Sequence, residues 1–316
     1  MAFLRVITPG MVTTIQDWGR WGWQSLGVPV AGPMDLFSHR MANALVGNQP
    51  DWATLEVTLV GPEVEFQDDR TAAVTGAEFE VVVDGRPQPL NESFAVSAGS
   101  VVRFGRRSLG ARAYLAIGGG IASPPVLGSR ATHLPSEMGG LGGRPLRVGD
   151  RLPLGRMESE PRPSSGRTVK PMSLLPDGKV IARILPGPHA DRFAPDALDV
   201  LQSAPYVLDA ASNRMGYRLH GPRLRHAGGP EMLSDAIPLG ALQVPVAGEP
   251  ILLMADRPTT GGYPILATVI SADMHLAGQL VPGDSIVFVV SSLSEAIAAL
   301  IAQEQTLMAI EPGSGG

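Results

Sequence analysis

The chain has 316 residues, enough for two domains, and 44% of them are hydrophobic against 17% charged, so intrinsic disorder is excluded for most of its length. Because the chain has no cysteine, disulfides and thiolate nucleophiles are excluded. Its six histidines show no spacing typical of metal ligands, so no metal site is predicted. The formal net charge is −5 without a basic stripe, which argues against a nucleic-acid partner.

The N-terminal segment gives no sign of secretion or membrane anchoring. Residues 1–7 lack the apolar core and small-residue cleavage site of a signal peptide. No apolar run reaches the roughly 18 residues that a membrane span requires. We therefore expect a soluble cytoplasmic protein with no membrane partner.

Helices are expected at only three places. Asp35 is a typical N-cap for a helix that runs to about Leu45. Residues 196–202 indicate a second, shorter helix. A capping box at residues 292–295 opens a third, rich in Ala, Ile and Leu, which runs to about Met308.

Short strands account for most of the remaining order. Apolar or β-branched runs bounded by turn-forming residues lie at 72–76, 79–83, 100–104, 111–117, 251–255, 267–271 and 285–290. The Asp84-Gly85 pair that follows one of these runs predicts a two-residue hairpin turn. With 38 glycines and 29 prolines, the pattern predicts a mainly β protein with closed or barrel-like sheets and peripheral helices.

One segment separates the chain into two halves. Between Leu154 and Asp177 the sequence is rich in Pro, Ser and charge and has no apolar period, as is typical of a linker. We therefore predict a β-barrel-like domain over residues 1–155, a linker or exposed connection over 156–178, and a second β-barrel-like domain with a terminal helix over 179–316.

Polar clusters beside glycines are the candidates for chemistry, and the first lies at residues 13–22. It brings Gln16, Asp17 and Arg20 together between aromatic residues. The alternative is a plain turn, in which Asp17 accepts backbone N–H groups and Arg20 stacks on a neighbouring tryptophan.

The second cluster, residues 27–35, is a glycine-rich loop that leads into the first helix. Such a loop can bind an anion through free N–H groups, but Asp35 counts against an anion and fits a simple N-cap better. Further along, Glu56 is a carboxylate in an otherwise apolar strand. It either faces solvent or is an acid with a shifted pKa.

The third cluster, residues 212–219, carries Arg214 and Arg218 four positions apart. Two guanidinium groups beside Asn and Tyr could clamp a carboxylate or phosphate. The alternative is a surface strand with both arginines directed outward.

The fourth cluster, residues 255–264, follows a buried apolar run and resembles an active-site loop more than a turn. Successive backbone N–H groups of its Thr-Thr-Gly-Gly stretch could bind an oxyanion or phosphate. The alternative is a glycine turn with Asp256 and Arg257 paired at the surface. The candidate residues are Asp256, Arg257, Thr259, Thr260, Gly261, Gly262 and Tyr263.

Together these segments resemble one family, the C subunits of 5-oxoprolinase, also called allophanate hydrolase subunit 2 and KipA. This family is similar to one half of the carboxyltransferase domain of urea carboxylase. The resemblance runs from about Phe3 to Val290. The six motifs that carry it lie at residues 14–22, 27–35, 42–48, 127–130, 213–218 and 256–264.

The resemblance implies two cyclophilin-like β-barrel domains and a partner, the KipI-like B subunit, together with an A subunit. It implies an ATP-dependent 5-oxoprolinase, a lactam amidohydrolase that is active only in complex and converts 5-oxoproline to glutamate. ATP would be bound by the complex rather than by this chain. One alternative is an allophanate hydrolase subunit 2 or a urea-carboxylase-like carboxyltransferase, the only case that needs biotin. Another is a non-catalytic antagonist of a KipI-like protein that regulates a sensor kinase.

The resemblance also implies roles for the clustered residues around a small anionic substrate. Arginines would hold anionic groups, threonines and glycines would donate hydrogen bonds, and an aspartate would transfer protons. The expected catalytic residues are Asp17, Asp256, Arg257, Thr259 and Thr260. The expected substrate-binding residues are Gln16, Arg20, Asp35, Arg214, Arg218, Gly261, Gly262 and Tyr263. We expect the groups from both halves to meet in one groove.

Overall fold

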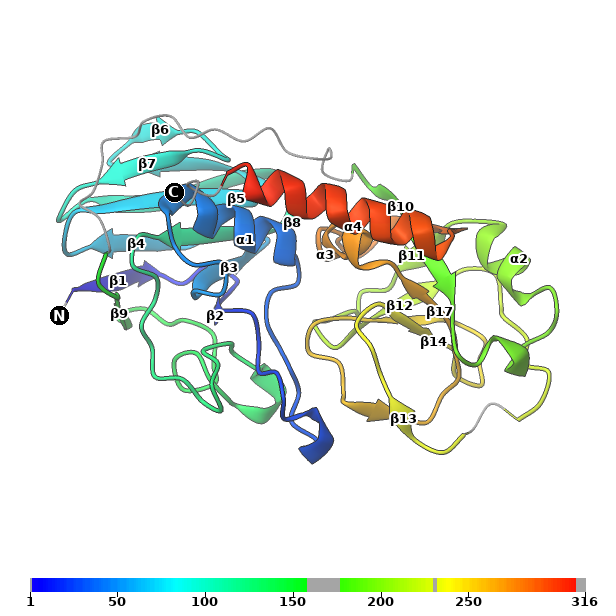
Figure 1. Ribbon diagram of the computed structural model, residues 1–316. Helices are drawn as coiled ribbons and strands as arrows, with labels where there is room; N and C mark the ends of the chain where they lie inside the picture. Colours follow the sequence, from blue (N-terminus) through cyan, green and yellow to red (C-terminus); the bar gives the residue numbers. More distant parts are fainter. Residues whose placement is uncertain (1, 158–176, 230–231, 311–316) are drawn as a thin grey trace, which may run out of the picture. The chain divides into compact units, whose positions relative to one another are not determined.

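The computed structural model describes residues 2–157, 177–229 and 232–310 (Figure 1). These residues form two compact units. Within the described ranges, unit 1 holds 2–20, 31–157 and 304–310, and unit 2 holds 21–30, 177–229 and 232–303.

The two units exchange short segments. Residues 21–30 belong to unit 2 and residues 304–310 to unit 1. The predicted domains, 1–155 and 179–316, are continuous ranges and do not include this exchange. The connection expected at 156–178 lies almost entirely outside the described residues. The domain boundaries therefore stay a prediction.

Unit 1 is built on one antiparallel sheet that curls into a half-barrel. Its nine strands are β1 (Phe3–Thr8), β2 (Val12–Gln16), β3 (Thr54–Thr58), β4 (Glu63–Phe66), β5 (Arg70–Val83), β6 (Arg86–Gln88), β7 (Ser93–Val96), β8 (Val101–Ile117) and β9 (Arg151–Pro153). The order is β2-β3-β8-β4-β1-β9, with β5 on β8 and both β6 and β7 on β5. A short 3-10 helix, Leu134–Ser136, lies in the loop region between β8 and β9.

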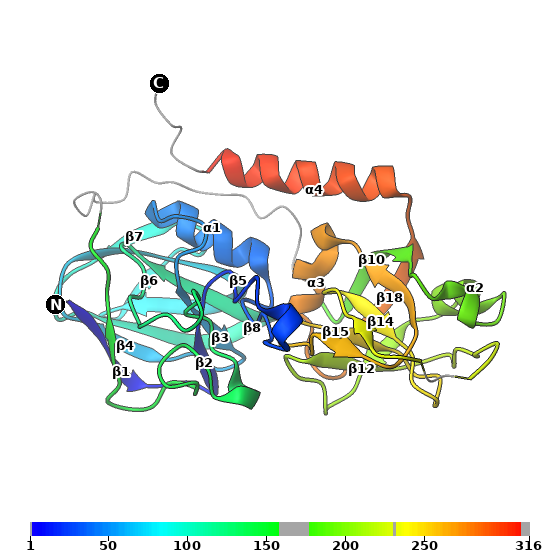
Figure 2. The same ribbon diagram turned by 60° about the horizontal axis from the view of Figure 1, so that its bottom comes forward.

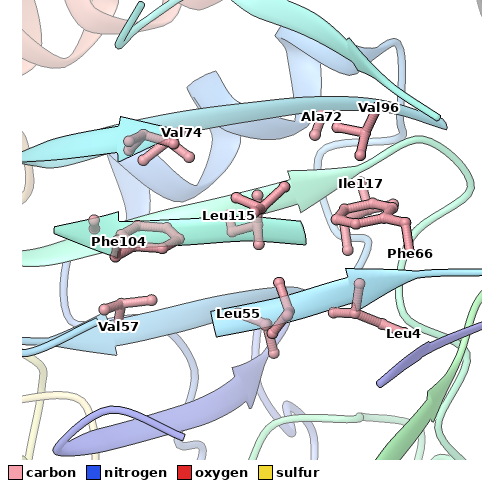
Figure 3. Packing of buried hydrophobic residues seen from close by; sticks show 14 of the residues in the cluster. Leu4, Leu55, Val57, Phe66, Ala72, Val74, Val96, Phe104, Leu115 and Ile117 are labelled. Atoms are coloured by element: carbon pink, nitrogen blue, oxygen red, sulfur yellow. The ribbon is translucent and has the colours of Figure 1, made fainter. Parts of the chain in front are cut away.

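Alternate residues of the long strands β5 and β8 pack on opposite faces of the sheet. Figure 3 shows Val74 and Leu115 in the main cluster on one side of the sheet. Their chain neighbours belong to other clusters, because successive side chains of a strand point to opposite faces. Ala73 packs with helix α1 (Leu36–Val46), and Tyr114 packs with Ala42 of the same helix. The helix lies along β5 and β8 (Figure 2).

The local signals for helices and turns are confirmed. The Asp35 side chain accepts the Ser38 N–H at 2.8 Å and caps α1. Asp84 and Gly85 have φ of 49° and 80°, as the central residues of a type I′ hairpin turn require. Helix α4 (Leu293–Met308) begins with the expected capping box at Ser292. In the parts of the chain that the structure describes, no helix is long and apolar enough to span a membrane.

Unit 2 contains a closed barrel of seven strands (Figure 1). The strands are β10 (Lys179–Pro186), β11 (Tyr206–Leu208), β12 (Gly216–His220), β14 (Ala241–Gln243), β15 (Ile251–Leu253), β17 (Ile265–Val269) and β18 (Ser285–Val290). Their order is β10-β17-β14-β15-β12-β11-β18, and closure leaves no exposed sheet edge. The mainly β, barrel-based fold is therefore confirmed, with one closed and one half-open sheet.

The remaining elements of unit 2 are short. A two-stranded sheet joins β13 (Asp235–Ala236) to β16 (Thr260–Gly261) outside the barrel. The helices are α2 (Ala197–Gln202), in the place that the sequence predicts, and α3 (Met274–Gly278). Single 3-10 turns occur at Gln24–Leu26, Ala190–Arg192 and Ser271–Asp273.

Candidate functional site

The third and fourth polar clusters meet in unit 2 because their strands pair. Strands β12 and β15 are antiparallel, with Gly216 opposite Leu253. Arg214 lies just before β12 and Asp256 just after β15, so the pairing brings these two residues together. The Asp256 N–H donates to the Arg214 carbonyl at 2.8 Å.

Their side chains form a two-pronged ion pair. Arg214 Nε and Nη2 donate to the two carboxylate oxygens of Asp256, each at 2.9 Å. Asp256 is only 1% exposed, so this carboxylate is held away from water. The interpretation of Asp256 and Arg257 as a surface pair is therefore wrong, since Asp256 pairs with Arg214 from the other strand.

Arg257 is a buried arginine whose guanidinium group has few partners in the described parts of the chain. It is 9% exposed, and its Nε donates to the Ile237 carbonyl at 3.0 Å. Among the described residues its Nη groups have no hydrogen-bond partner and no carboxylate lies within ion-pair distance. Burial lowers the pKa of Arg257. A buried charge without a partner is unfavourable in the free protein, and such a guanidinium is well suited to bind an anion.

The loop after Arg257 is held by the small sheet of β13 and β16. The Ile237 N–H donates to the Thr259 carbonyl and the Met232 N–H to the Gly262 carbonyl, both at 3.1 Å. Thr260 and Tyr263 are exposed, and Thr259 is half-buried. Their side-chain hydroxyls make no hydrogen bond within the described residues, which leaves them available to a ligand.

Gly261 is closely packed by the ends of two side chains. A Cβ atom at this position would lie 2.6 Å from Ile237 Cδ1 and 2.8 Å from Gln243 Nε2. Gln243 Nε2 in turn donates to the Tyr263 carbonyl at 3.2 Å. A larger residue at 261 would therefore have to move the ends of the Ile237 and Gln243 side chains, and with them the hydrogen bond to Tyr263.

Arg218 does not share the environment of Arg214. It lies within β12 between the buried residues Tyr217 and Leu219, and its own side chain is exposed. Strand alternation therefore directs Arg218 outward, whereas Arg214 is fixed by Asp256. The predicted contact of Arg218 with substrate stays a prediction.

In unit 1 the first cluster fixes a distant loop. Asp17 accepts hydrogen bonds from the Gly19 N–H at 3.0 Å, and from Ser129 Oγ and the Arg130 N–H at 2.5 Å each. Arg20 is fully buried and donates to the carbonyls of Val126 at 2.9 Å and of Ala131 at 2.7 Å. Asp17 thus accepts backbone N–H groups, as the turn interpretation expected, and both residues tie the segment 126–131 to the sheet.

Gln16 and Asp35 are also engaged within unit 1. Gln16 is buried, and its Nε2 donates to Thr14 Oγ1 at 3.0 Å and to the Thr132 carbonyl at 3.1 Å. Asp35 serves as the helix cap. The substrate contacts of Gln16, Asp17, Arg20 and Asp35, and the shared groove with unit 2, stay predictions.

Glu56 is the centre of a buried polar network that the sequence predicts only in part. Glu56 is 1% exposed, so its interpretation as a solvent-facing residue is wrong. Its Oε2 accepts the Met34 N–H and the Tyr114 hydroxyl, both at 2.8 Å, and that hydroxyl accepts the Asp35 N–H at 2.8 Å. Burial raises the pKa of Tyr114. The network anchors the loop that enters α1, and the lone carboxylate in an apolar strand was its only sequence signal.

His39 of α1 lies beside this network and should make the protein sensitive to acid. Burial lowers its pKa from 6.5 to about 4, although the charges of Asp17 and Glu56 oppose the shift. Below pH 6.5 the unfolded chain takes up a proton that the folded chain does not. We expect the His39 contribution to the free energy of unfolding to fall by about 3 kcal/mol between pH 7 and pH 4.

Urea unfolding of the wild type and His39→Gln at a series of pH values measures this contribution. The variant also loses packing and the contact between His39 Nδ1 and Thr54 Oγ1 at 3.0 Å, so the slopes with pH are compared rather than absolute stabilities. The wild type should lose stability more steeply on acidification. Parallel curves for the two proteins would contradict the buried, neutral state of His39.

The groups placed for a ligand are cations rather than metal-binding acids. In the described ranges no cluster of three His, Asp or Glu side chains could hold a metal ion. In unit 1, Arg130 lines a pocket, and its Nε donates to the Ser123 carbonyl at 2.8 Å. Sequence reasoning did not select Arg130 as a site residue, although it ends the motif at 127–130.

Comparison with known proteins reveals two kinds of relative. The profile of the family described as "Carboxyltransferase domain, subdomain A and B" matches residues 26–290. The chain is 42% identical to the C subunit of 5-oxoprolinase from Escherichia coli over 296 residues, which cover 94% of both chains. It is 36% identical to "Urea amidolyase" of Lachancea kluyveri, over 98% of this chain and 18% of that protein.

A solved structure has the same fold. The crystal structure of the K. lactis urea amidolyase matches with a TM-score of 0.90 and 33% identity, over 99% of this chain. The chain spans only 20% of that protein. The similarity to the urea-converting enzyme thus concerns one part of a much larger chain.

Proposed function

The chain belongs to the family of carboxyltransferase domains, subdomain A and B, and we propose that it is the C subunit of an ATP-dependent 5-oxoprolinase. This enzyme would open the lactam of 5-oxoproline to give glutamate. The observation that carries the proposal is the 42% identity to the C subunit of a 5-oxoprolinase over 94% of both chains. We further propose that the chain acts in the cytoplasm, only in complex with a KipI-like B subunit, its direct partner, and with an A subunit.

Arg257 supports a small anionic substrate. 5-Oxoproline carries a carboxylate at neutral pH, and the free Nη groups of a buried guanidinium can hold a carboxylate with two parallel hydrogen bonds. Thr259, Thr260 and Gly262 would donate to the lactam oxygen, where negative charge develops as the amide is attacked.

The contacts of Asp17 and Asp256 favour a role in positioning other residues over direct proton transfer. The Asp256 carboxylate is occupied by Arg214, and the Asp17 carboxylate accepts three hydrogen bonds from its own unit. We propose that Asp256 orients Arg214 and the substrate loop. The general acid or base would then be supplied by another group of the complex.

ATP is proposed to bind to the complex rather than to this chain. Only Lys170 and Lys179 are available as lysines, and neither lies in the glycine-rich pattern that cradles phosphates in P-loop proteins. ATP would make the stable lactam reactive by activating its oxygen. The role of this chain would be to hold the 5-oxoproline.

A second candidate function is carboxyl transfer. The match to urea amidolyase over 98% of this chain favours it, as does the family description. In that case biotin, carried by a partner, would be the cofactor, and the same arginine and hydrogen-bond donors would hold the carboxylate that is transferred.

An assay of the purified chain with and without its two partner proteins separates these functions. With 5-oxoproline and ATP as substrates, we expect glutamate from the complete mixture only, with no effect of avidin. ATP consumption that requires urea and bicarbonate and that avidin abolishes would indicate the biotin-dependent alternative. A complete mixture that neither forms glutamate nor consumes ATP would overturn the proposal and favour the non-catalytic KipI antagonist.

A further inference from the structure

A pocket of about 670 Å³ lies in unit 1. Three stretches of chain line it together with Arg130: residues 52–53 before β3, 119–122 after β8 and 155–157 after β9. Its volume falls in the range of roughly 300–1,000 Å³ that is typical of small-molecule sites. None of the candidate-site residues of unit 2 belongs to this lining.

The charged groups of the pocket are both cationic. Arg130 and Arg156 line it, and none of the acidic residues that the structure describes does. The Arg130 Nε is held by the Ser123 carbonyl at 2.8 Å, while its Nη groups have no partner within the described residues. Arg156, the second cation of the lining, is exposed. Guanidinium groups without carboxylates favour an anionic ligand.

The position of Arg130 is fixed by the buried first cluster. Asp17 holds the Arg130 N–H at 2.5 Å, and Arg20 holds the carbonyls on either side of it, at Val126 and Ala131. These hydrogen bonds compensate the desolvation of the two buried charged side chains only while the loop keeps this conformation. The arrangement therefore holds the cation of the pocket in place before any ligand arrives.

Trp52 and the glycines of the lining form a closely packed wall. The Trp52 carbonyl accepts the Asn43 side-chain N–H at 2.8 Å, and Gly120, with φ of 66°, leaves room for the indole. A Cβ atom at Gly120 would lie 3.2 Å from Trp52 Cε3. Gly119 and Gly155 pack backbone against backbone, since a Cβ at Gly119 would lie 2.6 Å from the Gly155 carbonyl oxygen. An indole in such a wall offers a surface on which a planar ring can stack.

We propose that this pocket binds a small organic anion, with a carboxylate or phosphate group on Arg130 and a flat ring against Trp52. The pocket shares no residue with the proposed 5-oxoproline site and would hold a second ligand. Asp17 and Arg20 act in it as positioning residues.

Isothermal titration calorimetry on the full chain tests the proposal with four probes. Benzoate and adenosine monophosphate carry a ring and an anionic group, and they distinguish a carboxylate ligand from a phosphate ligand. Adenosine and inorganic phosphate each lack one of the two features. We expect one of the two complete probes to bind with a Kd below about 1 mM, and both partial probes to bind at least about tenfold more weakly.

Variants then locate the site. Arg130→Met should weaken binding of the complete probe at least about tenfold, and Arg156→Met by a smaller factor. Arg156 is exposed, so its replacement leaves folding intact. The exposed Arg106, outside the lining, provides the matched control Arg106→Met, which should bind like the wild type.

Two results would overturn the proposal: neither complete probe binds at about 10 mM, or Arg130→Met and Arg156→Met both bind as tightly as the wild type. Thermal melting of the Arg130→Met protein shows whether its loop remains folded. Arg257→Met should bind the probes unchanged, so a failure here is distinguishable from a failure of the 5-oxoprolinase assay.

Discussion

Arg257→Met should lower kcat/KM of the reconstituted complex for 5-oxoproline by at least about 100-fold, equivalent to about 3 kcal/mol of transition-state stabilisation. The residue is only 9% exposed and lacks a carboxylate partner within the described residues. In such a weakly screened site an anionic substrate gains far more from the charge than it would at the surface. The measurement is the initial rate of glutamate formation at several concentrations of 5-oxoproline.

The same substitution should not destabilise the chain. Methionine removes a buried charge, whose desolvation offsets the loss of the single hydrogen bond from Arg257 Nε to Ile237. We expect the Tm of Arg257→Met to equal or exceed that of the wild type. Loss of activity together with retained stability is typical of a functional group that folding does not need.

Two further variants complete this test. Arg257→Lys keeps the charge but not the planar fork, so its activity should fall between those of the wild type and Arg257→Met. Arg223 is exposed and makes no hydrogen bond within the described ranges, so Arg223→Met is the matched control and should retain full activity. Activity of Arg257→Met within about threefold of the wild type would remove Arg257 from substrate binding.

Local sequence signals predicted the helices well because their causes are local. The cap at Asp35 and the box at Ser292 act within three or four residues of the helix starts that they define. Strands β5 and β8 were each expected as two separate runs. The break in β5 is a β-bulge near Gly76, where φ is 85° and the register with β8 shifts, so the strand continues through it.

The side-chain contacts of the candidate site could not be predicted, because they depend on the pairing of strands that are far apart in the sequence. The fourth cluster follows a buried strand, as the sequence predicts, but the partner of Asp256 lies 42 positions away and depends on the pairing of β12 with β15. Asp17 likewise meets Arg130 across 113 positions. Sheet topology brings such residues together. The alternation of hydrophobic residues along a strand does not indicate which other strand it pairs with, so no spacing in the sequence predicts these contacts.

The buried pair of Arg214 and Asp256 should show a large coupling in a double-mutant cycle. Arg214→Met leaves a carboxylate that is 1% exposed without its cation, which should lower the free energy of unfolding by about 3–5 kcal/mol. Asp256→Leu should cost less, because the Arg214 side chain is 11% exposed and can reach solvent. The measurement is urea unfolding of the chain at neutral pH.

The double variant Arg214→Met/Asp256→Leu should recover most of the lost stability, since two apolar side chains can replace a buried ion pair. The surface pair of Arg5 and Glu65 is the matched control, because Arg5 is 52% exposed and Arg5→Met should cost less than about 1 kcal/mol. If the two buried substitutions were simply additive, the ion pair would not be what joins the ends of β12 and β15. The orientation of the loop that carries Arg257 would then have to come from the backbone hydrogen bonds alone.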